Sequence, residues 1–395
     1  MELALPFEQL LSQLEDTPTI QAKARLVRKL ADAHTSPIID GSRAVFYYVS
    51  GEALTVALEG DWTHWKPTAF MSYLPDTPLW YRVEHFPPAA RLEYRVVVNG
   101  HPRLDPHNPH TALNSHGTHS ELYMPEYQPP RELSDDKSFT RGTIEEHWIN
   151  SRALGDRRTF WICFPPNYNS EKEYPVAYFN DGDHYLYYAD LPRVMDYLIM
   201  NRQVEPFMAV LLRPNERESD YVFNNQYVRF LVDELVPYMD DNYSTRATVT
   251  SRAIVGASLG GLCAAYTARR RPGVFGHVAG QSGNYTLRQD ALLDDYAAAQ
   301  NLGIRFHLTV GEFETNLRGQ GHPEDNLVEA QRRFAELLRK KGYTVSSAEY
   351  PEGHQWGFWR AHIGDLLKFF WGKPTPLLGR LAQARPTKMP AHQRV

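Results

Sequence analysis

Apolar and polar residues follow a helical period near the start of the chain. In PFEQLLSQLED (residues 6–16) the apolar positions recur three and four residues apart, and a second such run follows Thr17-Pro18-Thr19 and ends near residue 34. This pattern predicts an N-terminal helical segment over residues 1–40, in which two helices form a hairpin packed on the body of the protein. A helix that binds a partner is the alternative interpretation.

The period then changes to that of β-strands. Residues 41–125 contain short runs rich in Val, Tyr and Leu that Gly, Pro and Asp separate, with no helical pattern between them. The runs are AVFYYV (44–49), LTVALEG (54–60), LWYRVEHF (79–86) and LEYRVVVNG (92–100). Several strands at this spacing predict a small all-β sandwich. Residues 126–142 are rich in Pro and charge, which is typical of a linker.

A third pattern, compact apolar runs that alternate with helical stretches, occupies residues 143–372. The runs are TFWICFPP (159–166), YPVAYFND (174–181), FMAVLLRP (207–214), RAIVGAS (252–258), VFGHVAGQSG (274–283) and IRFHLTVGE (304–312). The helical stretches include YVRFLVDELVPYMDDNY (227–243) and NLVEAQRRFAELLRKKG (326–342). This alternation predicts an α/β domain with a mostly parallel sheet and helices on both faces. Residues 373–395 are expected to form a loosely ordered tail.

The composition excludes several classes of protein. Hydrophobic residues make up 42% of the chain, which rules out a mainly disordered protein, and the net charge of -5 leaves no sequence-wide basic footprint for nucleic acid. Two cysteines cannot build a disulfide framework, and no apolar run reaches the about eighteen residues that span a bilayer. The start of the chain lacks the cationic region of a signal peptide. We therefore expect a soluble cytoplasmic protein with no nucleic-acid or membrane partner, and its oligomeric state stays open.

The motif with the clearest chemistry is Gly256-Ala257-Ser258-Leu259-Gly260, which lies between an apolar run and a helical stretch of small residues. In a G-x-S-x-G turn from strand to helix the serine is strained, and a side chain at either glycine would clash. The turn presents the hydroxyl at a helix N-terminus, where backbone N–H groups face developing negative charge. This context predicts Ser258 as a catalytic nucleophile, with a serine in an ordinary strand–helix turn as the alternative.

A serine nucleophile needs a base to take its proton and an acid to orient that base. His277 and His307 lie inside apolar runs and are expected in the core, whereas His354 follows a short strand and a glycine in AEYPEGHQWGF (348–358) and is the predicted base. The acid is expected at the end of the preceding strand, where Glu314 is preferred and Glu312 is its rival.

The oxyanion that forms when an ester is attacked needs two N–H donors. One is the backbone N–H of Leu259, directly after the nucleophile. The other is expected after the run YPVAYFND, where Gly182 lets the chain turn and Asp183 offers its backbone N–H. An acidic side chain beside an oxyanion is unfavourable unless it points away, which makes Asp183 unusual at this position.

Residues 155–372 resemble the enterochelin esterase and esterase D branch of the α/β-hydrolases. The motifs that carry the resemblance occur in order: NDGD (180–183), NERE (215–218), FLVDELVPYMDDNY (230–243), VGASLGG (255–261), GQSGNY (280–285), VGEFE (310–314) and PEGHQWGFWR (351–360). Position by position, the resemblance implies Ser258 as nucleophile, His354 as base, Glu314 as acid and Asp183 as the second oxyanion donor. It implies four further residues that contact the substrate, namely Arg217, Trp356, Trp359 and Arg360.

Residues 41–125 are similar to the immunoglobulin-like modules that precede glycogen-branching enzymes and many esterases of this branch. The similarity lies in LEGDWTHWKP (58–67), LWYRVEHFPPAARLEYRVVVNG (79–100) and LDPHNP (104–109). Such modules bind glucans in some relatives and pack beside the active site in enterochelin esterases. Trp62 and Trp65 are expected in the core of the sandwich, and stacking on sugar rings is the alternative.

The resemblance implies a serine carboxylesterase that hydrolyses a small-molecule ester through an acyl-enzyme and without a cofactor. Its expected substrate is a trilactone siderophore of the enterobactin type, whose anionic ferric form should meet cations such as Arg217, Arg288 or Arg360. A feruloyl or acetyl esterase acting on plant polysaccharide, with the first module binding carbohydrate, is the alternative. A glucan-binding module on a hydrolase scaffold of little activity is the non-enzymatic alternative.

Five histidines between His101 and His119 raise the question of a metal site. They lie in a Pro- and Asn-rich segment that is expected to be a loop, without the spacing of structural zinc sites, so no metal is predicted. The thiols of Cys163 and Cys263 are expected to pack in the interior rather than to react.

Overall fold

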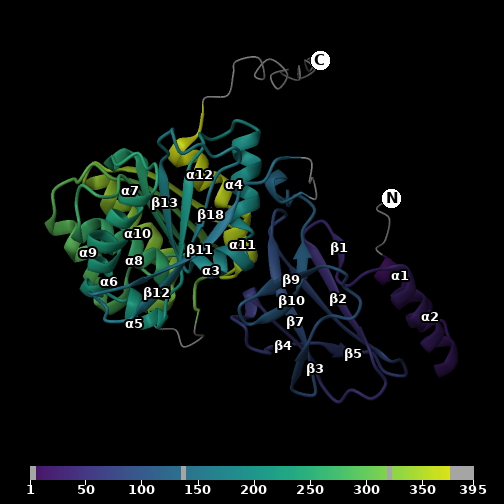
Figure 1. Ribbon diagram of the computed structural model, residues 1–395. Coiled ribbons are helices and arrows are strands. Elements are labelled where there is room, and N and C mark those ends of the chain that lie inside the picture. Colours follow the sequence, from purple (N-terminus) through teal and green to yellow (C-terminus); the bar gives the residue numbers. More distant parts are fainter. Residues whose placement is uncertain (1–5, 135–138, 318–322, 374–395) are drawn as a thin grey trace, which may run out of the picture.

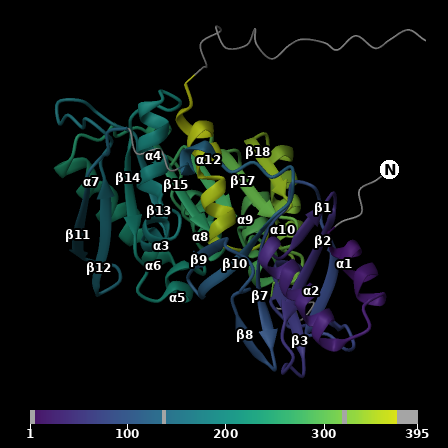
Figure 2. The same cartoon turned by 90° about the vertical axis from the view of Figure 1, so that its right-hand side faces the viewer.

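The computed structural model describes residues 6–134, 139–317 and 323–373. These residues form two modules that lie side by side, an all-β module preceded by two helices and a larger module that combines helices with strands (Figure 1). The turned view shows the two helices in front of strands β1 and β2 of the first module (Figure 2). The tail predicted for residues 373–395 lies, apart from Lys373, outside the described residues.

Two antiparallel sheets build the first module. Its strands are β1 (Ile38–Asp40), β2 (Arg43–Val49), β3 (Val56–Gly60), β4 (Ala69–Phe70), β5 (Ser72–Tyr73), β6 (Leu79–His85), β7 (Arg91–Val98), β8 (His101–Arg103), β9 (Thr111–Asn114) and β10 (Gly117–Tyr123). One sheet has the order β1-β2-β6-β5, and the other has the order β4-β3-β7-β10-β9, with β8 also paired to β7. All these pairings are antiparallel, which confirms the predicted sandwich.

Strand β2 shows how the two-residue period places the core. Phe46 points between the two sheets, whereas Val45 and Tyr47 point outward and pack against the helices α1 (Pro6–Glu15) and α2 (Ile20–Ala33). The helices bury their apolar stripe on this outer face, and the expected helical hairpin is confirmed.

The main correction to the predicted sandwich concerns the segment of histidines, which was expected to be a loop and instead contains strands. It contains the strands β8, β9 and β10, of which β10 pairs with both β7 and β9. Strand β10 buries polar side chains on both of its faces, with Ser120 on one face and His119 and Glu121 on the other. The apolar alternation that normally reveals a strand is therefore missing.

A single sheet organises the second module. Its strands are β11 (Ile144–Asn150), β12 (Arg157–Cys163), β13 (Val176–Asn180), β14 (Met208–Leu212), β15 (Arg252–Ala257), β16 (His277–Gln281), β17 (Arg305–Gly311) and β18 (Thr344–Tyr350). Their order is β11-β12-β14-β13-β15-β16-β17-β18, and the pairings from β14 to β18 are parallel. This is the mostly parallel sheet that the apolar runs predicted.

Helices cover both faces of this sheet. They are α3 (Gly182–Tyr187), α4 (Leu191–Met200), α5 (Arg217–Tyr221), α6 (Asn225–Arg229), α7 (Val236–Asn242), α8 (Leu259–Arg270), α9 (Leu287–Ala298), α10 (Leu327–Lys340), α11 (Trp356–Ala361) and α12 (Ile363–Trp371). Helices α6 to α10 share one apolar core with strand residues such as Tyr178, and α3, α4, α11 and α12 share the other with residues such as Phe179. Within the described part of the chain, no helix has the length and apolar character needed to cross a membrane.

Candidate active site

The Ser258 turn joins the central strand β15 to helix α8. Ser258 has φ 55° and ψ -118°, a conformation that L-residues rarely adopt. A Cβ on Gly256 would lie 2.2 Å from the backbone of Gly260, and a Cβ on Gly260 would lie 2.9 Å from a carboxylate oxygen of Asp181. Close backbone packing therefore requires Gly256, and a side chain at Gly260 would have to displace the Asp181 carboxylate.

Three polar side chains form a hydrogen-bonded series at this turn. The Oγ of Ser258 lies 3.1 Å from Nε2 of His354, and Nδ1 of His354 lies 2.6 Å from Oε2 of Glu314. The three residues come from the ends of β15 and β17 and from the loop after β18, so the parallel sheet gathers them at one edge. Glu314 is the acid beside His354, whereas the rival Glu312 is exposed.

The Glu314 carboxylate is fully buried and has a donor for each oxygen. Oε1 accepts hydrogen bonds from the Ser282 hydroxyl at 2.7 Å and from the Gly311 backbone N–H at 2.7 Å, and Oε2 faces His354. The indole of Trp359 in turn donates to the Ser282 hydroxyl at 2.8 Å. These bonds stabilise the carboxylate and hold it in one orientation.

The two residues expected to form the oxyanion hole each lie in the first turn of a helix. Leu259 is the first residue of α8, where backbone N–H groups have no partner within the helix. Asp183 lies in the first turn of α3. Its carboxylate approaches Nε of Arg213 at 3.8 Å and is not among the described groups that line the cleft, and burial raises its pKa. The acidic side chain thus faces Arg213 rather than the described lining of the cleft.

Arg217 joins the two segments on which these donors lie. Its guanidinium donates to both carboxylate oxygens of Asp181, at 2.8 and 2.9 Å, and to the backbone oxygen of Ala257 at 3.0 Å. Asp181 immediately precedes α3, and Ala257 immediately precedes Ser258. Arg217 lines the cleft, but its positive charge is balanced by Asp181.

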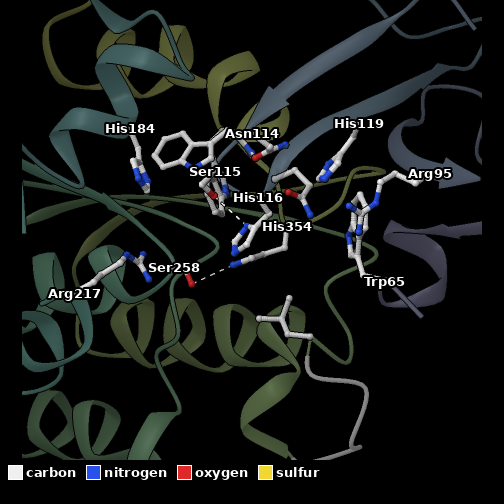
Figure 3. Close-up of a pocket in the computed structure, with 14 residues that line it drawn as sticks. Trp65, Arg95, Asn114, Ser115, His116, His119, His184, Arg217, Ser258 and His354 are labelled. Carbon is white, nitrogen blue, oxygen red and sulfur yellow. Dashed lines mark hydrogen bonds between the residues drawn. The ribbon is translucent and has the colours of Figure 1, made fainter. Parts of the chain in front are cut away.

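A cleft of about 680 Å³ lies above Ser258, between the two modules (Figure 3). The larger module contributes His184, Arg217, Ser258, Leu317, His354, Gln355, Trp356 and Trp359, and the sandwich contributes Trp65, Arg95, Asn114, Ser115, His116 and His119. Figure 3 shows Trp65, Arg95 and His119 across the cleft from Ser258 and Arg217. The site is therefore built by both modules.

The tryptophans of the sandwich have different positions. Trp62 packs in the core against Phe46 and Phe86, as expected. Trp65 instead lines the cleft, which corrects its predicted place in the core. Its ring lies 4.2 Å from that of His119, and its indole N–H donates to Asp61 at 3.1 Å.

Of the other residues expected to meet substrate, Trp356 and Trp359 line the cleft, and Arg288 and Arg360 are not among the described residues that do. Arg360 approaches Glu121 at 4.0 Å, and Arg288 lies over the ring of Phe223. The prediction missed Arg95, which pairs with Glu59 at 2.6 Å. It also missed the polar residues at the tip of the β9–β10 hairpin, which carry no motif.

The two histidines and the two thiols that were expected in the interior are found there. His277 and His307 are buried, and burial lowers the pKa of each to about 4. Cys163 and Cys263 are buried free thiols. In the described ranges, no three side chains of His, Cys, Asp or Glu are grouped as a metal site would require.

A mostly parallel sheet covered on both faces, with a G-x-S-x-G turn after its central strand, defines an α/β-hydrolase. Residues 151–370 match the family described as "Putative esterase", and the chain belongs to this esterase family. It is a carboxylic ester hydrolase.

Comparison with known proteins gives both sequence and fold relatives. The uncharacterised protein YjcH of Bacillus subtilis is 27% identical over 58% of this chain and 97% of its own length. The iron(III) salmochelin esterase of Escherichia coli is 21% identical over 76% of this chain and 80% of its own. The crystal structure of the enterobactin esterase from Shigella flexneri superimposes with a TM-score of 0.69 at 20% identity, covering 83% of this chain and 92% of that one. This likeness confirms the predicted fold of both modules.

Proposed function

We propose that the chain is a serine esterase in which Ser258, His354 and Glu314 form the catalytic triad. The observation that carries the proposal is the continuous series of hydrogen bonds from Ser258 through His354 to the buried Glu314. His354 takes the hydroxyl proton as Oγ bonds to the ester carbonyl carbon, and Glu314 stabilises the resulting imidazolium. The backbone N–H groups of Leu259 and Asp183 would hold the oxyanion.

The acyl-enzyme then forms and is hydrolysed. His354 returns its proton to the leaving alkoxide as the C–O bond breaks, which leaves the acyl group on Ser258. A water molecule gives a proton to His354 and its oxygen attacks the acyl carbon. Collapse of this second tetrahedral intermediate releases the carboxylic acid and restores the Ser258 hydroxyl.

A trilactone siderophore of the enterobactin type is the substrate that we propose. The likeness to the enterobactin esterase extends over the sandwich as well as the hydrolase module, and the sandwich supplies one wall of this cleft. Arg95, Arg217 and the histidines His116, His119 and His184 supply N–H donors along that cleft for the oxygens of such a ligand, while Glu59 and Asp181 balance the charges of the two arginines. The buried free thiols agree with hydrolysis in the reducing cytoplasm.

A feruloyl esterase is the second candidate. A xylanase and feruloyl esterase of Xylanibacter ruminicola is 27% identical over 39% of this chain, and a solved ferulic acid esterase superimposes with a TM-score of 0.51 over 59% of it. The indoles of Trp65, Trp356 and Trp359 offer flat surfaces on which a ferulate ring could stack. These similarities cover a smaller share of this chain than the 83% covered by the enterobactin esterase, so we place this candidate second.

The two candidates are separated by assaying purified protein against ferric and iron-free enterobactin and against ethyl ferulate, with the Ser258→Ala variant as control. We expect trilactone hydrolysis with kcat reduced by at least about 10³-fold in the variant. Hydrolysis of ethyl ferulate without any of the trilactone would favour the second candidate. Activity that is unchanged by Ser258→Ala would refute the proposed nucleophile.

A further inference from the structure

The loop that carries His354 is held from two sides. On the hydrolase side, Phe313 donates its backbone N–H to the Glu352 oxygen at 3.2 Å. On the sandwich side, Arg91 of β7 donates its backbone N–H to the oxygen of Pro351 at 3.3 Å. The side-chain oxygen of Asn114, at the end of β9, accepts the N–H of Trp356 at 3.2 Å. Contacts from the sandwich therefore lie on both sides of His354 along the chain.

Glycines allow the sandwich to lie directly against this loop. A Cβ on Gly353, next to His354, would lie 2.0 Å from the carboxyl carbon of Asp61. A Cβ on Gly357 would lie 1.8 Å from Nη2 of Arg91. Since neither position has room for a methyl group, a displacement of the sandwich side chains would be transmitted to the backbone on both sides of His354.

Arg91 is the central charge of this contact. Its side chain is 2% exposed and lies among the carboxylates of Glu93, Glu121 and Glu352. Nη2 donates to Glu93 at 2.6 Å, Nε donates to Glu121 at 3.0 Å, and Nη1 lies 3.9 Å from Glu352. Loss of one member of such a buried cluster leaves the remaining charges uncompensated, so the cluster strongly favours one geometry.

Glu352 connects this cluster to the catalytic loop. It lies two residues before His354, and its side chain is 3% exposed. Its second carboxylate oxygen accepts a hydrogen bond from Nε2 of His362 at 2.8 Å. The carboxylate is therefore held by the hydrolase module on one side and attracted by Arg91 on the other.

We propose that Arg91 is a positioning residue for catalysis, which braces the loop of residues 351–357 from the sandwich and so holds Nε2 of His354 at the distance from Ser258 that proton transfer needs. This inference rests on the proposed function insofar as His354 is the base. Arg91 itself does not line the cleft among the described residues and has no expected contact with substrate. Its effect should fall on kcat rather than on KM.

The test compares Arg91→Lys and Arg91→Met with Tyr94→Phe. Lysine keeps the charge but cannot present the planar fork of donors, and methionine removes both. Tyr94 is a matched control because it is buried on the same strand as Arg91. Its substitution by Phe removes a hydrogen bond to Asp105 (2.7 Å) without changing a contact to the loop of residues 351–357. Hydrolysis of p-nitrophenyl acetate gives kcat and KM, and unfolding temperatures report on stability.

A proton NMR measurement reads the position of His354 without turnover. The proton between Nδ1 of His354 and Glu314 should give a low-field resonance that His354→Gln abolishes. We expect Arg91→Met to lower kcat by about 10- to 100-fold with KM within about threefold, and to shift or broaden this resonance. Arg91→Lys should show a smaller loss, and Tyr94→Phe should keep both the wild-type kcat and the resonance.

Unchanged kcat and resonance in Arg91→Lys and Arg91→Met would overturn the proposal, as would an equal loss in Tyr94→Phe, which would trace the effect to general destabilisation. If Arg91→Met does not fold, Arg91→Lys decides alone by the same two measurements. Should wild-type hydrolysis prove independent of Ser258, the proposed function fails, but the resonance still shows whether Arg91 positions His354 against Glu314.

Discussion

The guanidinium of Arg217 meets the carboxylate of Asp181 through two hydrogen bonds, at 2.8 and 2.9 Å, and donates a third to the backbone just before Ser258. An arginine in an esterase cleft suggests an anchor for an anionic substrate. Here the charge is balanced by Asp181, and the side chain links the start of α3 to the Ser258 turn.

We therefore expect Arg217→Met to lower kcat for neutral and anionic esters alike, by about tenfold or more, because it loosens the segments expected to hold the oxyanion. The measurement is kcat and KM for p-nitrophenyl acetate and for an ester with a carboxylate on its alcohol group. A loss confined to KM for the anionic ester would instead identify Arg217 as a substrate anchor.

The acid of the proposed triad can be tested with a matched pair of variants. Glu314→Gln should lower kcat by about 10²- to 10⁴-fold, because a neutral amide no longer stabilises the imidazolium of His354. Glu312→Gln changes an exposed side chain two residues away and should leave kcat within about twofold. Similar losses in both variants would contradict the assignment of the acid.

The two tryptophans of the sandwich should respond differently to truncation. Trp65→Ala removes part of the cleft wall and should raise KM for an aromatic ester with little change in unfolding temperature. Trp62→Ala leaves a cavity in the sandwich core and should cost about 3–5 kcal/mol in the free energy of unfolding. Calorimetry and steady-state kinetics on both variants check this, and the opposite pattern would show that Trp65 is the core residue.

The glycine at the start of the Ser258 turn is predicted to be irreplaceable for a steric reason. Gly256→Ala would place its Cβ 2.2 Å from the backbone of Gly260, so we expect a loss of about 1–3 kcal/mol or more in stability together with loss of activity. Gly51→Ala is the control, since a Cβ there meets nothing within 4 Å. Urea unfolding of the two variants should show the difference, and equal stabilities would contradict the close packing of the turn.

Buried histidines should make the protein less stable in mild acid. Burial lowers the pKa of His307 to about 4, whereas a histidine in the unfolded chain titrates near about 6.5. Between these values the unfolded state binds the proton and the folded state does not, so stability is lost as pH falls from 6.5 toward 4, by up to about 1.4 kcal/mol per pH unit. His307→Leu should lose less stability than wild type between pH 7 and pH 5 in urea unfolding, and equal losses would show that His307 does not titrate as a buried group.

Much of the hydrolase module could be predicted because its buried strands are uninterrupted apolar runs and its G-x-S-x-G turn needs glycines at two positions. The same reasoning fails at the edge strand β11, whose residues are exposed or only partly buried and form no apolar run. It fails again at β10, whose buried residues His119 and Glu121 are polar because they join the buried charges around Arg91.

The candidate site likewise contains residues that the sequence could predict and residues that it could not. Ser258, His354 and Glu314 follow strands in chain order, and a sequence pattern can express such an order. The sandwich wall depends on how two modules pack, and neither Arg95 nor His116 follows a spacing that reveals this packing. The pairing of Arg217 with Asp181 could not be predicted from the sequence either, because Asp181 is distant along the chain and contacts Arg217 only in the folded protein.

The buried charges between the modules also have a consequence for protein engineering. A hinge that opened the cleft would have to hydrate Arg91 and its carboxylates together, so we expect the modules to move as one body. A chimaera that carried a foreign sandwich would need to retain Asp61, Arg91 and Asn114 to keep the His354 loop in place. We therefore expect the sandwich and the His354 loop of this esterase to be exchangeable only as a pair.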